Sequence, residues 1–336
     1  MPINKYNDIS PRTAGFATAD LLERGQHLLV TERFGHTDAQ GQNKTKTRKW
    51  RRYLSFPRAT APMAEGITPA GQQINYEDVE ANLDQYGDWV PLTDVIADTH
   101  EDPVLKEMMG ITGEQAAETI ECVRVDVLKG GSNAYYANGV ASRSLVTSPA
   151  TRNDLRKVFR DFQKNKAKMI TRIIGATAKV STEPVSAGFF AMGHTDLLAD
   201  LKNISGWTPV AQYSDHMKAL PGEVGAVEEI RFILTPLFEP WSAAGVAGTT
   251  YLSGGAKVSG STACDVYPLI IVGRDAYAIV PLAGKNAVEI GVQNPGKKTD
   301  SDPLGQRGFV SWKTWQAAAI LNNLWIARLE VAATAL

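Results

Sequence analysis

The chain has 336 residues, of which 43% are apolar and 21% are charged, values that are ordinary for globular proteins. Its 35 basic and 36 acidic side chains give a formal net charge of −1. This balance excludes a protein whose whole surface is committed to nucleic acid or to anionic lipid, so any electrostatic function must come from local patches. The length allows two domains or one large domain.

Charge is unevenly distributed in the first part of the chain. Residues 1–60 hold 11 Lys and Arg against 5 Asp and Glu, whereas residues 61–130 hold 3 against 15, which gives local net charges of +6 and −12. Opposite charges in neighbouring segments can guide head-to-tail association between copies, or both segments can simply be solvated surface.

The N-terminal residues predict an arm followed by a long hairpin. Residues 1–43 are mostly polar, which is typical of a segment that becomes ordered against a partner. Residues 44–53 (KTKTRKWRRY) then alternate along the chain, which predicts a β-strand. Turn-forming residues over 61–71 and a second extended run to about Thr93 complete the expected hairpin. Because basic side chains beside aromatic rings also suit a nucleic-acid groove, nucleic-acid binding through 44–53 is the alternative function.

Two helices are expected next. Residues 112–115 (TGEQ) have the pattern of a capping box, which predicts a helix start at Thr112, and residues 103–109 could add turns before it. Lys129 and Gly130 mark its end. A second helix is predicted over residues 152–168, with one apolar face and one charged face.

In the C-terminal half, the predicted helices and strands are shorter. Residues 195–201 predict a short helix, and residues 229–234 and 267–272 predict buried strands. The apolar runs 312–321 and 324–331 are joined by two asparagines, which tolerate a tight turn, so a hairpin is expected there, although the alanines also suit a helix.

The sequence offers little that indicates catalysis. The five histidines are scattered, and the usual phosphate-binding and serine-hydrolase motifs do not occur. Two His/Asp pairs, His194 with Asp196 and Asp215 with His216, are better explained as caps or solvated groups, since a metal site needs three or four converging ligands. We therefore expect no catalytic, cofactor or metal site, and no signal peptide or membrane-spanning segment.

Five separated motifs resemble those of the N4-like phage coat proteins, which are major capsid proteins of tailed bacteriophages with the Hong Kong 97 fold. They occur in order between about residues 50 and 330. They are PMAEGITP (62–69) with LDQYGDWVPLTD (83–94), LPGEVG (220–225) with RFI (231–233), VGRDAY (272–277), DPLGQRG (302–308) and WKT (312–314).

The resemblance implies an α+β fold with five parts. These are an N-terminal arm (1–45), a long hairpin called the E-loop (46–96), a P domain with a spine helix (97–185), a central A domain (186–292), and strands that return to the P domain (293–336). By the same resemblance, the C-terminal run is strand and not helix.

The implied function is structural and not enzymatic. Copies would self-assemble as pentamers and hexamers into an icosahedral shell around double-stranded DNA, in the host cytoplasm and then in the virion. Scaffolding, portal and decoration proteins are implied partners, whereas a membrane and cofactors are not.

We expect the hairpin charges to form contacts between subunits. Basic side chains of one copy would meet carboxylates of the next, with Glu65 near the hairpin tip. The basic residues are Arg48, Lys49, Arg51 and Arg52, and the acidic residues are Glu77, Asp78, Glu80, Asp84 and Asp88.

Overall fold

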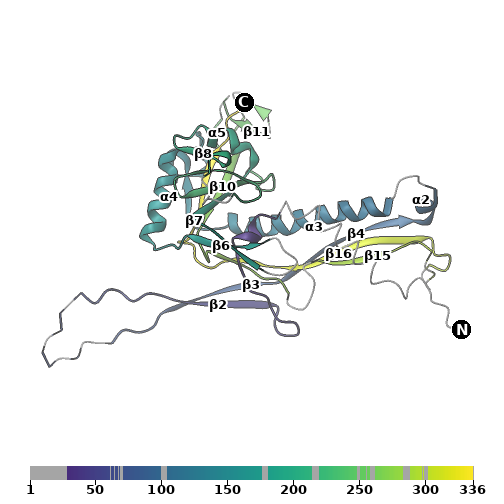
Figure 1. Ribbon diagram of the computed structural model, residues 1–336, viewed down its shortest axis with the longest axis horizontal. Helices are drawn as coiled ribbons and strands as arrows, with labels where there is room; N and C mark the ends of the chain where they lie inside the picture. Colours follow the sequence, from purple (N-terminus) through teal and green to yellow (C-terminus); the bar gives the residue numbers. More distant parts are fainter. Residues whose placement is uncertain are drawn as a thin grey trace.

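The computed structural model has three parts, which Figure 1 shows side by side. A head of strands and short helices stands upright, a long helix over a sheet extends from its base to one side, and a two-stranded hairpin projects to the other side. The structure describes residues 29–60, 62–63, 65–66, 68, 71–99, 104–175, 181–213, 219–247, 250–254, 256–257, 262–282, 288–296, 298 and 302–335.

The hairpin consists of β2 (Thr47–Tyr53) and β3 (Tyr76–Asn82), which pair antiparallel along their whole length. This confirms the strand predicted from the alternation within residues 44–53. The short strand β1 (His36–Thr37) pairs with β14 (Tyr277–Ile279) and so ties residues before the hairpin to the base of the head. Of the predicted arm over 1–45, residues 1–28 lie outside the described residues.

The long helix α3 (Val104–Lys129) packs on a three-stranded antiparallel sheet. The strand order is β15 (Glu289–Gln293), β16 (Arg307–Gln316) and β4 (Asp84–Thr93), and the short helix α2 (Asp94–Thr99) follows β4. With 26 residues, α3 is about 39 Å long at 1.5 Å per residue. Its end at Lys129, where Gly130 N donates to Asp126 O, confirms the predicted helix stop.

The predicted helix start at Thr112 is wrong, because α3 begins at Val104 and Thr112 lies in its interior. The Thr112 hydroxyl donates to Met108 O at 2.6 Å, one turn earlier, and does not cap the helix. Gln115 donates to Asp88 of β4 and accepts from the Trp312 indole of β16, so it joins the helix to the sheet. Thr112 and Gln115 therefore form hydrogen bonds with Met108, Asp88 and Trp312. In a capping box they would instead bind backbone amides at the start of the helix.

The head is built on an eight-stranded mixed sheet with the order β5-β18-β13-β7-β10-β9-β8, in which β6 also pairs with β7. Helices α4 (Arg152–Lys164) and α5 (Leu198–Lys202) contribute to its main apolar core. The strands are β5 (Ala134–Tyr136), β6 (Ile170–Gly175), β7 (Ser181–Gly193), β8 (Trp207–Pro209), β9 (Glu223–Val227), β10 (Ile230–Leu234), β13 (Val266–Val272) and β18 (Ile326–Ala332).

Several sequence predictions for the head are confirmed. Strands β10 and β13 are buried at every residue, as predicted for 229–234 and 267–272. The expected helix over 195–201 is a single turn of 3-10 helix followed by α5. Other single 3-10 turns lie at Thr31–Arg33, Ala137–Gly139, Arg143–Leu145 and Val210–Gln212.

Helix α4 begins as predicted and ends earlier than predicted. The Thr151 hydroxyl accepts from Asp154 N and caps the start. At the other end, Lys166 takes a φ of 53°, and Ala167 N donates to Phe162 O at 2.8 Å. This is the left-handed closing turn that ends many helices, so Lys166 and Lys168 follow the helix and do not extend it.

The C-terminal apolar runs form strands, as the resemblance implied, but not the hairpin. Strand β17 (Ala318–Ile320) pairs with β14, whereas β18 lies between β5 and β13 in the head. Residues 293–336 are therefore shared: β16 lies under α3, and β18 belongs to the sheet that also holds most strands of 186–292. The small hairpin of β11 (Leu252–Ser253) and β12 (Ala256–Lys257) lies near the C-terminus.

Candidate functional site

The hairpin brings most of the predicted contact residues together in one chain. Its register places Arg51 opposite Asp78, and the Arg51 Nε to Asp78 Oδ1 distance is 2.8 Å. The Arg51 hydrogen bond lowers the pKa of the Asp78 carboxyl, so this pair is charged at neutral pH. Further cross-strand ion pairs join Lys49 to Glu80 and Arg52 to Glu77.

The remaining predicted residues lie at the hairpin base or elsewhere. Arg48 binds Asp38 at 2.5 Å, a carboxylate that also accepts from the Trp50 indole. Asp84 at the start of β4 pairs with Lys46 at 2.7 Å. Asp88 faces α3, where a hydrogen bond from Gln115 lowers the pKa of its carboxyl, and Glu65 is exposed in a turn near the hairpin tip.

The basic and acidic residues that we expected to meet between copies thus find partners within one chain. Exposed ion pairs add little to stability in water, so their role in the isolated chain is mainly to hold the hairpin register. The expected contact with a neighbouring copy stays a prediction. The residue types predicted segments of opposite charge but not that these charges pair within one chain. The alternation in both segments could have indicated that they form paired strands.

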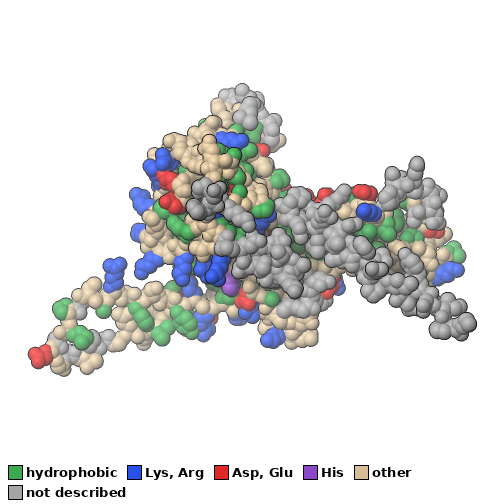
Figure 2. Space-filling view, viewed as in Figure 1, with side chains coloured by type: hydrophobic (Ala, Val, Ile, Leu, Met, Phe, Trp, Pro, Cys, Tyr) green, Lys and Arg blue, Asp and Glu red, His purple; other side chains and the backbone are tan. Residues whose placement is uncertain are grey.

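An apolar surface continues along the outer half of the hairpin, a feature that sequence reasoning missed. Figure 2 shows these hydrophobic side chains in green along the projecting hairpin. Large apolar side chains exposed along a projection are typical of a protein–protein contact. The exposed residues are Tyr53, Leu54, Phe56, Met63, Ile74 and Tyr76, and Met63 is the most exposed at 78%.

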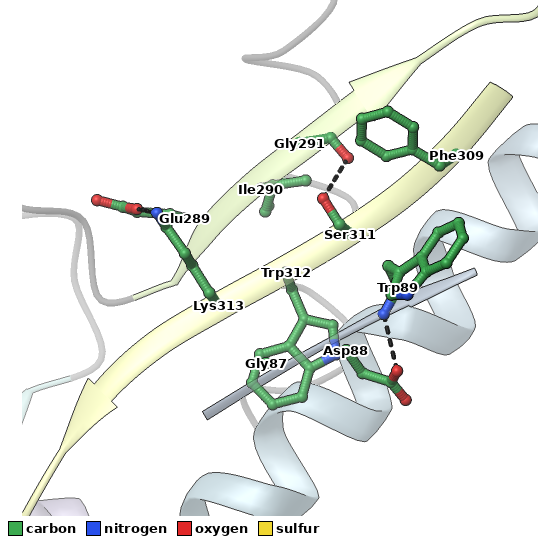
Figure 3. Close-up of a pocket in the computed structure, with 10 residues that line it drawn as sticks. All are labelled: Gly87, Asp88, Trp89, Glu289, Ile290, Gly291, Phe309, Ser311, Trp312 and Lys313. Carbon is green, nitrogen blue, oxygen red and sulfur yellow. Dashed lines mark hydrogen bonds and ion pairs between the residues drawn. The ribbon is translucent and has the colours of Figure 1, made fainter. Parts of the chain in front are cut away.

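A second candidate contact is a groove of about 730 Å³ on the sheet of β4, β15 and β16 (Figure 3). Trp89 and Phe309 contribute aromatic rings, and Trp89 is 61% exposed. A Cβ at position 87 would lie 2.6 Å from Trp312 O, so Gly87 allows the strands to approach closely there. The Lys313 to Glu289 ion pair of 3.0 Å borders the groove, which offers a partner an apolar surface that includes the rings of Trp89, Phe309 and Trp312.

The segment before the hairpin is anchored to α3 through a buried carboxylate. Glu121 is fully buried and accepts from Thr31 N at 2.9 Å, from Thr31 Oγ1 at 2.7 Å and from Val30 N at 3.2 Å. Burial raises the pKa of Glu121. The sequence signal was a lone acid on the apolar face of a helix, and sequence reasoning did not use it.

The histidine pairs act as expected where the structure describes them. His194 Nδ1 accepts from Asp196 N at 3.1 Å, so it caps the 3-10 turn, and burial lowers the pKa of its imidazole. Asp215 and His216 lie outside the described residues. Within the described ranges, no group of three or more His, Cys, Asp or Glu is arranged to hold a metal ion.

No helix in the described part of the chain is both long enough and apolar enough to cross a lipid bilayer.

Comparison with known proteins shows which family the chain resembles. The model of a family described as phage capsid protein matches residues 76–328. The major capsid protein of Pseudomonas phage KPP21 is 23% identical over 270 residues, which cover 76% of this chain and 68% of that protein.

Solved capsid structures share the fold at low sequence identity. The capsid of Ralstonia phage GP4 has a TM-score of 0.64 at 11% identity, covering 91% of each chain. The capsid of the cyanophage P-SCSP1u has a TM-score of 0.56 at 13% identity, covering 90% of this chain and 88% of that one. The expected α+β fold of the Hong Kong 97 type is thereby confirmed. The chain belongs to the phage capsid protein family and is a major capsid protein of a tailed phage.

Proposed function

We propose that copies of this chain assemble as pentamers and hexamers into an icosahedral shell that encloses double-stranded DNA. The observation that carries the proposal is the projecting hairpin, whose exposed outer half bears Leu54, Phe56 and Met63 without a core of its own. A two-stranded hairpin exposed on both faces is marginal in water, so a neighbouring copy must cover it. Many weak contacts repeated by symmetry allow a shell to form reversibly and still be stable.

The division of the chain follows from the same proposal. Residues 1–45 act as the N-terminal arm, 46–96 as the E-loop, 97–185 as the P domain with α3 as its spine, and 186–292 as the A domain. Within 293–336, β15 ends and β16 supplies the return to the P domain, and β18 completes the A-domain sheet.

The charged hairpin residues also serve the contact between copies in this proposal. Their intrachain pairs leave one side of each group solvated; Arg51, for example, is 51% exposed and Lys49 is 64% exposed. A row of basic side chains on β2 beside a row of acidic side chains on β3 can select the correct neighbouring edge.

The other roles of the chain in this proposal are structural. It acts without catalysis, contacts the packaged DNA without sequence specificity, and meets scaffolding, portal and decoration proteins during assembly in the host cytoplasm. The alternative, a dispersed nucleic-acid-binding protein that uses 44–53, is disfavoured because carboxylates of β3 neutralise the basic side chains of β2.

Size-exclusion chromatography and negative-stain electron microscopy of the purified chain test the proposal. We expect capsomers or shells, and a chain that stays monomeric under all salt conditions would contradict it. Replacing Leu54 and Phe56 with Ser is expected to abolish shells while the head keeps its unfolding transition. The matched control is Leu145→Ser, which removes an exposed leucine from a different surface.

A further inference from the structure

A basic stripe runs along the exposed side of α4. Arg156, Arg160 and Lys164 are exposed and recur every four residues, so they lie on one face of the helix. The stripe continues into the turn after the helix with Lys166 and Lys168, both exposed. Lys166 occupies a left-handed position where glycine is usual, so a cation is present there despite an unfavourable backbone conformation.

Much of this charge is not balanced by the residues that the structure describes. Glu228 binds Arg156 at 2.6 Å and also pairs with Arg152. Arg160 and Lys164 form no ion pair with any described residue. Like charges four residues apart weaken a helix. The helix dipole favours cations in the last turn, which accounts for Lys164 but not for Arg160 one turn earlier.

An acidic stripe lies on α3. Glu107, Glu114 and Glu118 recur at spacings of seven and four residues, so they share one face with Ile111, which is 61% exposed. Glu114 and Glu118 form no ion pair within the described ranges. Burial raises the pKa of the Cys122 thiol, and the carboxylates of Glu239 and Glu118 raise it further. Carboxylate charge therefore also lies at the end of the stripe near the head.

The two stripes lie on different sides of the molecule. In Figure 1, α4 lies on the left side of the head. Helix α3 extends to the right from the base of the head. Figure 2 shows Lys and Arg along that left side and Asp and Glu along the upper edge of α3. Opposite charges on opposite sides of one molecule suit a head-to-tail contact, in which each copy uses a different surface toward each neighbour.

We propose that the basic stripe of α4 in one copy docks against the acidic stripe of α3 in a second copy, and that repetition of this contact closes the capsomer ring. The inference rests on the proposed function and assigns one of its interfaces. A DNA contact would use the basic stripe alone and would leave unexplained the carboxylates of Glu114 and Glu118, which form no ion pair with a described residue. A second copy accounts for both stripes.

Charge reversal tests the contact. Arg160→Glu with Lys164→Glu, and separately Glu114→Lys with Glu118→Lys, place like charges across the interface. Each variant is expected to lower the yield of rings and shells by about tenfold or more. The chain that carries all four changes is expected to regain the yield, because the charges are then exchanged. Lys202→Glu with Lys298→Glu is the matched control, since both lysines are exposed and lie outside the stripes and the hairpin.

Mixing the two reversal variants gives a further test. Each repels itself but attracts the other, so mixed rings must alternate between variants and close only with an even number of subunits. Hexameric rings without pentameric rings are the expected result.

The outcomes separate the interface from the proposed function. Normal assembly of either reversal variant, or failure of the four-residue exchange to recover, would overturn the contact while wild-type shells uphold the function. Normal shells with reduced DNA content would also overturn it and would assign α4 to DNA. A wild-type chain that never assembles would overturn both.

A cross-link tests proximity without altering charge. Cys122 lies half-buried at the acidic stripe, and Gln163 lies exposed between Arg160 and Lys164. Gln163→Cys treated with a short bismaleimide is expected to give a ladder of covalent multimers from assembled protein. Lys202→Cys is the control and should give none. Absence of the ladder from assembled Gln163→Cys protein would overturn the contact.

Discussion

The head and the β2–β3 hairpin differ in how much of their surface one chain covers. Strands β10 and β13 of the head are buried at every residue, whereas Ala81 is the single buried residue among the strands of the hairpin. Apolar burial therefore stabilises the head within one copy. At its base, Trp50, Val79 and Ala81 pack into a small apolar cluster with Val280, Ala317 and Ala319. The outer half of the hairpin has register and charge pairing without buried apolar residues, so its lasting conformation depends on what it contacts. Changes in the head should act on folding, and changes in the hairpin should act on assembly.

The largest effect on folding is expected from Arg231→Met. Arg231 and Glu223 are both almost fully buried, and Arg231 Nε donates to Glu223 Oε1 at 2.7 Å. The substitution leaves a buried carboxylate without its counter-charge, at a cost of about 3–5 kcal/mol of unfolding free energy. Denaturant unfolding of the dispersed chain measures it.

The matched variant combines Arg231→Met with Glu223→Leu. Because it removes both charges, it is expected to recover much of the lost stability, even though Tyr213 loses its hydrogen bond to Glu223. A double variant as unstable as the single one would show that the ion pair is not the cause.

The anchor at Glu121 is expected to have the next largest effect. Glu121→Leu removes the acceptor of Val30 N and Thr31 N, which lie buried, at a cost of about 1–3 kcal/mol per unsatisfied group. Hydrogen exchange should rise over residues 29–34 and remain unchanged in β10 and β13. Equal protection in both proteins would contradict the anchoring role.

The same residue makes a prediction about pH. Because burial raises the pKa of Glu121 above its ordinary 4.5, the folded chain retains this proton at a pH where the unfolded chain has lost it. The associated stability is complete below 4.5 and is lost as the pH rises through the folded pKa. The stability difference between wild type and Glu121→Leu should therefore shrink as the pH rises from about 4 to 7. A stability difference that grows over this pH range would mean that the folded chain lowers the pKa of Glu121 and does not raise it.

A smaller effect is expected at the start of α4. Thr151→Ala removes the hydroxyl that accepts from Asp154 N, at a cost of about 1 kcal/mol of unfolding free energy. Thr151→Ser keeps the cap and should stay close to wild type. Equal losses in both variants would indicate that the methyl group, and not the hydrogen bond, matters.

The smallest effect on folding and a large effect on assembly are expected for Arg51→Glu with Arg52→Glu. Unfolding of the head should be unchanged, because the hairpin lies outside its core, while shell yield in electron micrographs should fall. Mixing this variant with Glu77→Arg, Asp78→Arg protein is expected to recover shells through charges on neighbouring copies. If shells recover only when all four changes are in one chain, these ion pairs act within the hairpin and not between copies.

Much of the fold could be predicted because its signals are local. The apolar periodicity of α4, the Thr151 cap and the continuous apolar runs of β10 and β13 depend on a few neighbouring residues. The hairpin was similarly visible from alternation and turn residues. For the candidate site, the sequence indicated which segment is charged but not its exposed apolar half, since exposure depends on what packs above a strand.

Other features were decided by contacts distant in sequence. Thr112 could cap a helix or bind back to Met108, and the packing of Gln115 against the sheet selected the second arrangement. The alanine-rich C-terminus could be helix or hairpin, and β5 and β13 made it a strand between them.

By itself, the amino-acid sequence determined the periodic elements, the segregation of charge and, through its motifs, the family. Only the tertiary structure decided which charges are already paired and which, such as Arg160 on α4 and Glu118 on α3, form no ion pair with a described residue. The physical reason is that residue type sets the charge of a side chain, whereas its partner and its exposure are set by the segments that fold against it.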